Sequence, residues 1–341
     1  MKKKLLGFAL VSMMALVLGA CGGSKDSGAA APAAGGGEAA KPEASSEAWA
    51  PKENIEMIVA YKAGSGTDNT SRVLTKYANK YIGQTVVINN LEGGSGSIGW
   101  TSLANAKPDG YTLGFVNLPT LMSNIVDDLG DYEVDSFIPI CNHVTETSVV
   151  LVAADSKYNT IQELVDDAKA NPDTLKASTN GSKASNHIGA QLFASTAGFT
   201  YSDIPYGGTA DQLLALRQHE VDFSVAKLAD FASFASEVKV LGVFDTKRLE
   251  EYPDVPTLGE CGYYDQWYGS ARAIVAPKGT PQNIIDFYAD AFKKMMEDPE
   301  YLADAEKASV TTNYMGPEDT AALFQAQYDF CTNTVAGLWT E

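Results

Sequence analysis

Alternating apolar runs and polar breaks along the chain predict repeated strand–loop–helix units. In the first unit, residues 55–60 form an apolar run rich in Ile and Val, which is typical of a buried strand. Apolar positions then recur at helical spacing over residues 71–82, and Thr67 and Asp68 are the predicted helix N-caps. Such a turn leaves the N–H groups of the first helical turn unpaired and pointing outward, which suits a bound anion.

Two further units of this kind follow in the first half of the chain. Strands are predicted over residues 85–90 and 111–116; the first leads to a helix over 98–106, and the second ends in a polar loop that begins at Asn117. Three such units in succession predict a parallel, doubly wound sheet. In such a sheet, ligands bind at the carboxyl ends of the strands.

Gly94, Gly96 and Gly99 satisfy the pattern G-x-G-x-x-G, which is typical of dinucleotide-binding proteins. In those proteins the motif lies in the first βα turn, and an acidic residue ends the following strand. Here the motif follows the second strand after a spacer, and the next strand ends in Phe115-Val116-Asn117. We therefore predict a second glycine-rich loop and not a nucleotide site.

The same pattern starts again after residue 160. A loop dense in hydroxyl and amide side chains, residues 179–187, leads from a short strand into a predicted helix over 188–197. Further strands are predicted over residues 201–206, 221–226, 238–244 and 271–276, and a helix is predicted over residues 211–219. Helices are predicted from residue 280 to the end of the chain.

The two halves predict two α/β domains. Between them, the strand-like runs 137–144 and 148–153 are separated by a polar break that could mark a crossing from one domain to the other. The predicted division is residues 50–146 and 271–341 for domain 1 and residues 147–270 for domain 2. Loops from both domains would line a cleft between them.

The N-terminus has the features of a bacterial lipoprotein signal. Three lysines precede an apolar run too short to span a membrane permanently, and the run ends in Leu18-Gly19-Ala20-Cys21, which resembles a lipobox. We predict a signal peptide over 1–20, lipidation of Cys21 and a flexible tether over 21–49, because that stretch is Gly, Ala, Ser and Pro with few large apolar residues. The alternative is an ordinary signal cleaved near Ala20. The predicted location is extracytoplasmic, at the outer face of the cytoplasmic membrane or in the periplasm.

Charge and composition narrow the classes of ligand. The formal net charge is −18, which argues against nucleic acid and against general adhesion to anionic lipid. An anionic ligand would therefore be held locally by backbone N–H groups and helix ends. Cys141, Cys261 and Cys331 show no metal-binding spacing, and their pairing stays open. No metal or cofactor is predicted, and the chain has no G-x-S-x-G, Walker A or H-E-x-x-H motif.

Several segments together carry a family resemblance. They occur in one order along the body of the chain: Gly64-Ser65-Gly66-Thr67-Asp68, Gly83-Gln84-Thr85-Val86-Val87-Ile88-Asn89-Asn90, Pro108-Asp109-Gly110-Tyr111-Thr112-Leu113, Ser185-Asn186-His187, Pro205-Tyr206-Gly207-Gly208 and Pro253-Asp254-Val255-Pro256-Thr257-Leu258. In this combination the chain resembles the substrate-binding receptors of tripartite tricarboxylate transporters, the Bug-type proteins. The resemblance implies a type II periplasmic-binding-protein fold, with two doubly wound α/β domains that close over a small organic anion.

The resemblance also implies which residues bind the ligand. The positions carried over are the first βα loop, the hydroxyl-rich loop and a neighbouring strand-end loop: Gly64, Ser65, Gly66, Thr67, Asp68, Ser182, Ser185, Asn186, Tyr206, Gly207, Gly208 and Thr209. Three further candidates come from the residues themselves. Asn117 and Lys227 each end a predicted strand, and Tyr61 could stack on a ring. For a lysine such as Lys227 a solvated side chain is the more common situation, and for Tyr61 a buried aromatic residue is.

This chain departs from the family pattern where charge is concerned. Lys62 and Ser65 interrupt the alanine–glycine run of the first loop, Leu91-Glu92 replaces the usual Arg-Pro, and Lys227 stands where a neutral polar residue is more common. The identity of the ligand therefore stays open among a di- or tricarboxylate, an acidic amino acid and an aromatic acid.

The predicted function is a monomeric, lipid-anchored receptor, not an enzyme. It would capture a small organic carboxylate and deliver it to the permease subunits of a tripartite tricarboxylate-type transporter. Two alternatives remain: a sensory binding module for a signalling partner, and an extracytoplasmic enzyme on the same fold.

Overall fold

The computed structural model describes residues 49–339. The predicted signal peptide, the lipidation site Cys21 and nearly all of the predicted tether lie outside these residues. Within them, no helix is long and apolar enough to cross a membrane. The strands form a mixed sheet in the order β2-β1-β3-β9-β4-β7-β5-β6, with β8 and β10 each paired to β4.

We call the strands on one side of this order the first half-sheet. Its parallel core is β1 (Ile55–Val59), β2 (Val86–Asn90) and β3 (Thr112–Leu118), and β9 (Gly269–Pro277) runs antiparallel to β3. The short β10 (Thr312–Met315) also belongs here. The associated helices are α1 (Gly66–Thr75), α2 (Ala78–Tyr81), η1 (Gly94–Gly96), α3 (Ser97–Ala104), α4 (Thr120–Val126), η2 (Val134–Ser136), α8 (Gln282–Met296), α9 (Pro299–Lys307) and α10 (Pro317–Asn333).

The second half-sheet is smaller. It contains β5 (Lys176–Thr179), β6 (Ser202–Pro205), β7 (Phe223–Lys227) and β8 (Val238–Val243). Strands β6, β5 and β7 are parallel, as the repeated βα pattern predicts. The associated helices are α5 (Ile161–Ala170), α6 (Ser185–Ala197), α7 (Thr209–Arg217) and η3 (Leu228–Glu237).

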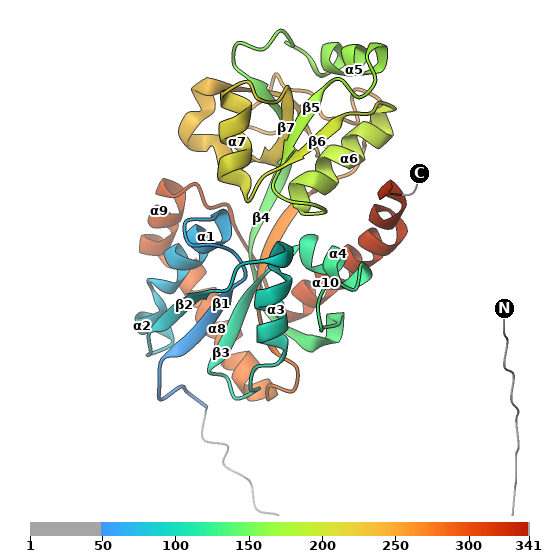
Figure 1. Ribbon diagram of the computed structural model, residues 1–341. Coiled ribbons are helices and arrows are strands. Elements are labelled where there is room, and N and C mark those ends of the chain that lie inside the picture. Colours follow the sequence, from blue (N-terminus) through green and yellow to red (C-terminus); the bar gives the residue numbers. More distant parts are fainter. Residues whose placement is uncertain (1–48, 340–341) are drawn as a thin grey trace, which may run out of the picture. The chain divides into compact units, whose positions relative to one another are not determined.

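One long strand, β4 (Phe137–Ala153), joins the two half-sheets, as Figure 1 shows. Residues up to Thr147 pair with β9, and residues from Ser148 onward pair with β7 and β8. The predicted polar break at 145–147 is therefore wrong as a break between strands. The chain stays extended there because β9 continues the ladder beside it, with Glu146 opposite Ser270.

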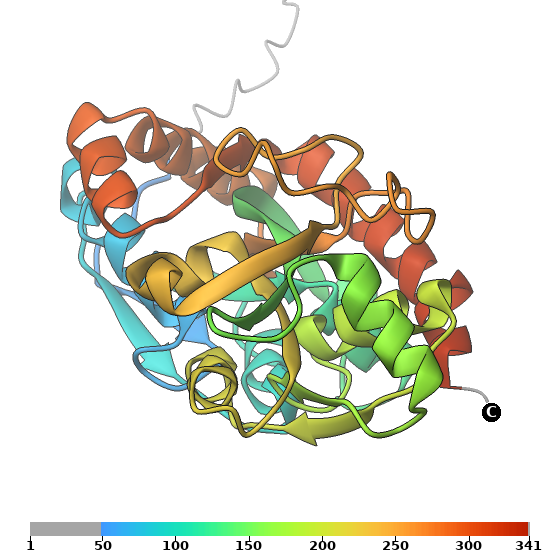
Figure 2. The ribbon, with the colours of Figure 1, turned by 90° about the horizontal axis from the view of Figure 1, so that it is seen from above.

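The C-terminal part returns to the first half-sheet and then reaches the second. Figure 2 shows the C-terminal helices, coloured red, along one side of the sheet. Helix α10 packs on β4 and α4, and the final turn η4 (Val335–Trp339) packs on α6. There the side-chain amide of Gln191 donates to the Leu338 carbonyl at 3.1 Å.

Two predicted helix starts need correction. Helix α1 begins at Gly66, and its N-cap is Ser65, whose Oγ accepts from the Asp68 amide at 3.2 Å; Thr67 and Asp68 lie inside the helix. The helix predicted over 71–82 is two helices separated at Lys76 and Tyr77. Helix α6 begins at Ser185, three residues earlier than predicted, so the end of the hydroxyl-rich loop forms the first turn of a helix.

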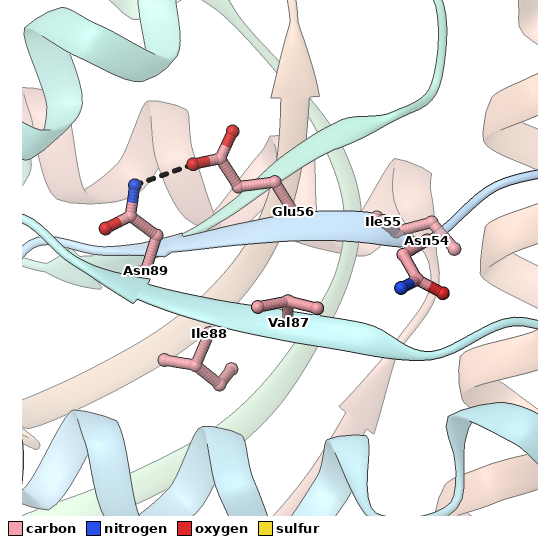
Figure 3. Close-up of a pocket in the computed structure, with 6 residues that line it drawn as sticks. All are labelled: Asn54, Ile55, Glu56, Val87, Ile88 and Asn89. Atoms are coloured by element: carbon pink, nitrogen blue, oxygen red, sulfur yellow. Dashed lines mark hydrogen bonds between the residues drawn. The ribbon is translucent and has the colours of Figure 1, made fainter.

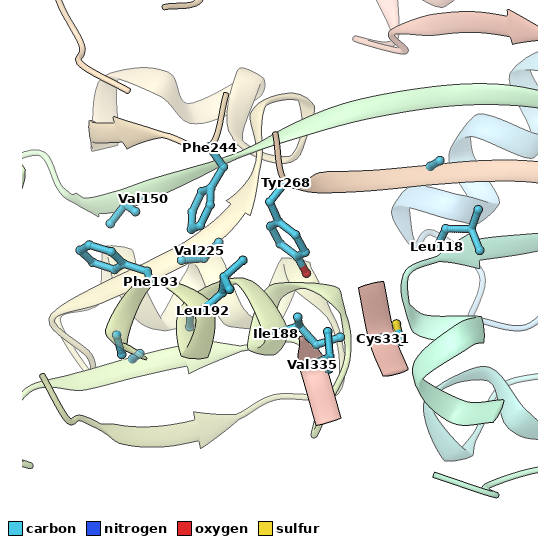
Figure 4. Close-up of a cluster of buried hydrophobic side chains, with 14 of the residues drawn as sticks. Leu118, Val150, Ile188, Leu192, Phe193, Val225, Phe244, Tyr268, Cys331 and Val335 are labelled. Carbon is cyan, nitrogen blue, oxygen red and sulfur yellow. The ribbon is translucent and has the colours of Figure 1, made fainter. Parts of the chain in front are cut away.

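A buried apolar cluster fixes the start of α6. Figure 4 shows Ile188, Leu192 and Phe193 of α6 facing β4, β7 and the residues before β9. The Tyr268 hydroxyl donates to the Ser185 carbonyl at the first residue of that helix. All three cysteines of the described chain are free, Cys141 and Cys331 being buried, so no disulfide links the half-sheets there.

Candidate functional site

The loop after β1 is held in place by the Asp68 carboxylate. This side chain is buried and accepts from the Gly64 amide at 2.8 Å, from Asn90 Nδ2 at 2.9 Å and from Arg72 Nε at 2.9 Å. Burial alone would raise the pKa of Asp68, but these donors lower it below its usual value. The structure thus directs Asp68 into its own loop, where it positions the start of α1. A direct contact with the ligand stays a prediction.

Gly66 and Thr67 begin α1, where the first amide groups lack intrahelical acceptors and carry the positive end of the helix dipole. Thr67 Oγ1 accepts from Asn117 Nδ2 at 2.8 Å, so the ends of β1 and β3 meet as predicted. A Cβ atom added to Gly66 would lie 3.2 Å from Arg272 Nη2 and 3.6 Å from Asp230 Oδ1. This point therefore faces residues from both half-sheets.

In the second half-sheet, the ammonium group of Lys227 contacts the residues at the start of α6, where the hydroxyl-rich loop ends. Lys227 is only 2% exposed, and its Nζ donates to Asn186 Oδ1 at 2.6 Å and to Ser185 Oγ at 3.3 Å. Asn186 in turn donates to Thr209 Oγ1 at 3.4 Å. Burial lowers the pKa of Lys227 to about 8. The solvated-lysine alternative is therefore wrong.

Three charged residues at this point were missed by the sequence analysis: Glu146 of β4, Asp230 of η3 and Arg272 of β9. Arg272 Nη1 lies 2.7 Å from Glu146 Oε2, and both side chains are buried. Burial, followed by the neighbouring Glu146 charge, raises the pKa of Asp230 to about 6. The available signal was a lone arginine inside an apolar strand together with a lone glutamate inside the polar interval of 145–147.

Two contacts link loops of the first half-sheet to loops of the second near Gly66. Lys62 Nζ lies 3.3 Å from Asp211 Oδ2, and Ser95 Oγ lies 3.4 Å from the Ser182 carbonyl. An added Cβ on Gly208 would be 3.9 Å from Lys62 Cε. The first βα loop, the glycine-rich loop and the two loops of the second half-sheet are therefore brought together.

The other predicted residues lie at the edge of this arrangement. The Tyr206 hydroxyl donates to Glu220 Oε2 at 3.1 Å within the second half-sheet, and Gly207 is exposed next to it. Ser182 contributes its carbonyl, as described above. Tyr61 is partly buried near Arg272, with its ring edge-on to Trp100 at 6.1 Å, and burial raises its pKa above the usual value. This packing suits a structural aromatic residue at the wall of the site.

Figure 3 shows a different hollow, beside β1 and β2. It is open and is lined by Asn54, Ile55, Glu56, Val87, Ile88 and Asn89. Its polar lining is already paired, since Asn89 Nδ2 donates to Glu56 Oε1 at 2.6 Å. Most of its lining comes from the start of β1 and the middle of β2, whereas ligands of parallel sheets bind at the carboxyl ends of the strands. We therefore place the candidate site at Gly66 and not in this hollow.

The fold and the converging loop ends define a class of protein, the two-domain periplasmic binding proteins, as predicted. The family described as "Tripartite tricarboxylate transporter family receptor" (TctC) matches residues 70–333. A relative from Cupriavidus necator, the UPF0065 protein in the gbd 5′ region, is 33% identical over 296 residues, covering 86% of this chain and 90% of the relative. The chain belongs to the TctC family of solute-binding receptors.

Solved structures agree with this assignment. The periplasmic binding protein BugD is 27% identical and superposes with a TM-score of 0.76, covering 85% of this chain and 99% of BugD. MatC of Rhodopseudomonas palustris, solved with bound malate, is 23% identical with a TM-score of 0.76, covering 84% of this chain and 99% of MatC. The predicted fold class is therefore confirmed.

Proposed function

We propose that this receptor captures a small organic carboxylate at Gly66 and delivers it to the permease subunits of a tripartite tricarboxylate-type transporter. The observation that carries the proposal is the buried Arg272, whose Nη1 pairs with Glu146 at 2.7 Å while its Nε has no hydrogen-bond partner among the described side chains (residues 49–231 and 235–339). Its Nη2 faces Gly66 at the positive end of α1. An arginine and a helix N-terminus directed at one point are a strong combination for binding a carboxylate.

The charge of the whole chain fits this local arrangement. Because the formal net charge is −18, general attraction would not concentrate an anion at the protein surface. Oriented amide groups and a buried guanidinium act at short range, where the low dielectric strengthens them. Malate in MatC, a protein of the same fold, supports a carboxylate as the ligand class.

Binding would be coupled to closure of two domains, which we propose divide at residues 147 and 271. Strands β4 and β9 pair up to Thr147 and Gly269, and β4 pairs with β7 from Ser148 onward, so we propose this crossing as the hinge. Loop contacts such as Lys62–Asp211 would form on closure and break on opening. Catalysis has no part in this proposal, and the unchanged ligand would be handed to the permease.

The membrane location rests on the sequence. We propose that the chain is lipidated at Cys21 after removal of residues 1–20 and works as a monomer outside the cytoplasm. Mass spectrometry of the mature N-terminus tests this step: a diacylated or triacylated Cys21 supports it, and an unmodified N-terminus near Ala20 contradicts it.

A thermal-shift screen of the full chain tests the proposed function. Panels of di- and tricarboxylates, amino acids and aromatic acids are added, because a ligand that binds only the folded state raises the melting temperature by mass action. At about 100 times its dissociation constant, a ligand adds about 2.7 kcal/mol to the free energy of unfolding. A hit recovered chemically unchanged supports a receptor, whereas a converted hit or no hit in any panel contradicts the proposal.

A further inference from the structure

Four ionisable side chains from three strands and a 3-10 helix meet behind Gly66. They comprise two acids and two bases: Glu146, Asp230, Lys227 and Arg272. Glu146, Lys227 and Arg272 are each at most 6% exposed. Their formal charges cancel, so the site as a whole is neutral when all four are ionised. Such a site differs from a pocket lined by cationic side chains alone.

The four groups do not use up one another's hydrogen-bonding capacity. Arg272 Nη1 and Glu146 Oε2 pair with each other at 2.7 Å, but Arg272 Nε is buried without a hydrogen-bond partner among the described side chains (residues 49–231 and 235–339). Lys227 Nζ has two acceptors for three protons. Leaving charged donors unpaired in a buried site is costly, so the arrangement leaves donor capacity for a further molecule.

A donor and an acceptor face the same point. Asp230 uses Oδ2 to accept from the Lys227 amide at 3.1 Å, whereas its Oδ1 is directed toward Gly66. The distances to a Cβ placed on Gly66 are 3.6 Å from Asp230 Oδ1 and 3.2 Å from Arg272 Nη2. A molecule at this point would therefore meet a carboxylate on one side and a guanidinium on the other.

We propose that the ligand carries an ammonium group as well as a carboxylate, so that the cleft selects an amino acid over the same acid without its amine. This inference rests on the proposed function. The carboxylate would bind Arg272 and the first amides of α1, and the ammonium would bind Asp230. A plain dicarboxylate would bring a second negative charge toward Glu146 and Asp230, and like charges at close range are unfavourable.

Matched pairs that differ only in the amine test the inference. Isothermal titration calorimetry of the full chain at pH 7.5, which is about 1.5 pH units above the raised pKa of Asp230, compares L-glutamate with glutarate, L-aspartate with succinate, and L-phenylalanine with 3-phenylpropionate. We expect the amine-bearing member of at least one pair to bind about 10-fold more tightly or better, which corresponds to about 1.4 kcal/mol.

The same ligand pairs are then measured with the variant Asp230→Asn. Because the variant removes the negative charge opposite Arg272, the preference for the amine should fall to within about 2-fold, while the deaminated acid binds as well as before or better. Glu260→Gln is the matched control, since Glu260 is exposed, pairs with Arg248 and lies outside the site; its preference should equal that of the wild type. If Asp230→Asn does not fold, the wild-type pairs alone decide.

The outcomes separate this inference from the proposed function. If the deaminated member of a pair binds as tightly as its partner or more tightly, the ammonium inference is overturned and the carboxylate receptor stands. If the preference for the amine persists unchanged in Asp230→Asn, the assignment to Asp230 is overturned. If no member of any pair binds while the broad screen finds a non-amino carboxylate, the inference fails alone; if the screen is also silent, both fail.

Discussion

Two aspartates in this protein, the buried Asp298 and the partly buried Asp230, have opposite environments. Asp298 caps α9 and accepts from Lys80 Nζ at 2.7 Å, from the Tyr81 hydroxyl at 2.8 Å and from the Glu300 amide at 2.8 Å. These partners, Lys80 first, lower its pKa to about 2. Asp230 in the candidate cleft accepts from the Lys227 amide and has a carboxylate neighbour, and burial followed by Glu146 raises its pKa to about 6.

The comparison distinguishes a carboxylate whose partners in the protein stabilise the fold from one that has few partners and is available to a ligand. At Asp298 both carboxylate oxygens accept hydrogen bonds, from α2 and from α9, and the chain gains stability from the ionised form. At Asp230 the raised pKa means that ionisation is less favourable than for an ordinary aspartate, and a ligand that supplies positive charge would favour it. Perturbed ionisable groups of the second kind cluster at functional sites.

The largest effect is expected from Arg272→Met. Removing the guanidinium leaves Glu146 as a buried, unpaired charge, which should lower the free energy of unfolding by about 3–5 kcal/mol and abolish ligand binding. Urea unfolding followed by circular dichroism measures the first effect. In the control Arg248→Met, the broken pair with Glu260 is exposed on both sides, and the change should be far smaller. Equal losses in the two variants would contradict the account.

Gly66→Ala is expected to affect binding more than stability. The glycine is helical and free of positive φ, so the backbone accepts alanine, but the new methyl group would occupy the space between Asp230 and Arg272. Ligand affinity should fall by about 10-fold or more, a free-energy loss of about 1.4 kcal/mol. Gly316→Ala is the control, because its Cβ would meet only Tyr314 Oη at 3.8 Å. Undiminished binding by Gly66→Ala would place the ligand elsewhere.

The two aspartates should respond to pH in opposite directions. Because the pKa of Asp230 is raised from 3.8 to about 6, its contribution to stability is present below pH 4 and is lost as pH rises through 6. Glu146, Lys227 and Arg272 are the charged groups that face it and act on this shift. Asp230→Asn should therefore be at least as stable as the wild type above pH 6, and the two should converge near pH 4.

For Asp298 the expected pH dependence of the free energy of unfolding has the opposite sign. Its pKa is lowered from 3.8 to about 2, so its contribution is present above pH 4 and is lost as pH falls through 2. Asp298→Asn should be less stable than the wild type at pH 7, and this difference should shrink below pH 4. Chemical denaturation at pH 3, 5 and 7 measures both variants; parallel pH profiles would break the comparison.

The smallest effect is expected at the edge of the cleft. Lys62 and Asp211 are each about half exposed, so Lys62→Ala should change the free energy of unfolding by no more than about 1 kcal/mol. Any influence should appear in the rate of ligand release, measured by stopped-flow displacement, because the pair links the two half-sheets. A stability loss as large as that of Arg272→Met would contradict the distinction between exposed and buried pairs.

Much of the fold could be predicted because local periodicity and core burial agree. The helix over 161–170 matches α5, where Thr160 and Glu163 form a reciprocal cap, and the apolar runs of β1 and β7 were found directly. The long β4 was not recognised, because a polar interval in one strand resembles a loop until its partner strand is known. The short α4 and β10 also escaped, since each depends on tertiary contacts.

The candidate site could be predicted only in part. Residues grouped by a loop pattern, such as Gly66, Thr67 and Ser185, were found because glycine and hydroxyl residues mark helix starts. Arg272 and Asp230 lie about 205 and 165 positions beyond Gly66, and a single sequence gives no measure of which distant charges meet in space. Their burial and missing partners exist only in the folded chain.

A crystal structure of the full chain with the tightest-binding carboxylate would test the central claim most directly. The account predicts ligand density beside Gly66, with a carboxylate oxygen within about 3.2 Å of Arg272 or of the first amides of α1. Density in the hollow beside β1 and β2, with the space at Gly66 left to water, would contradict it.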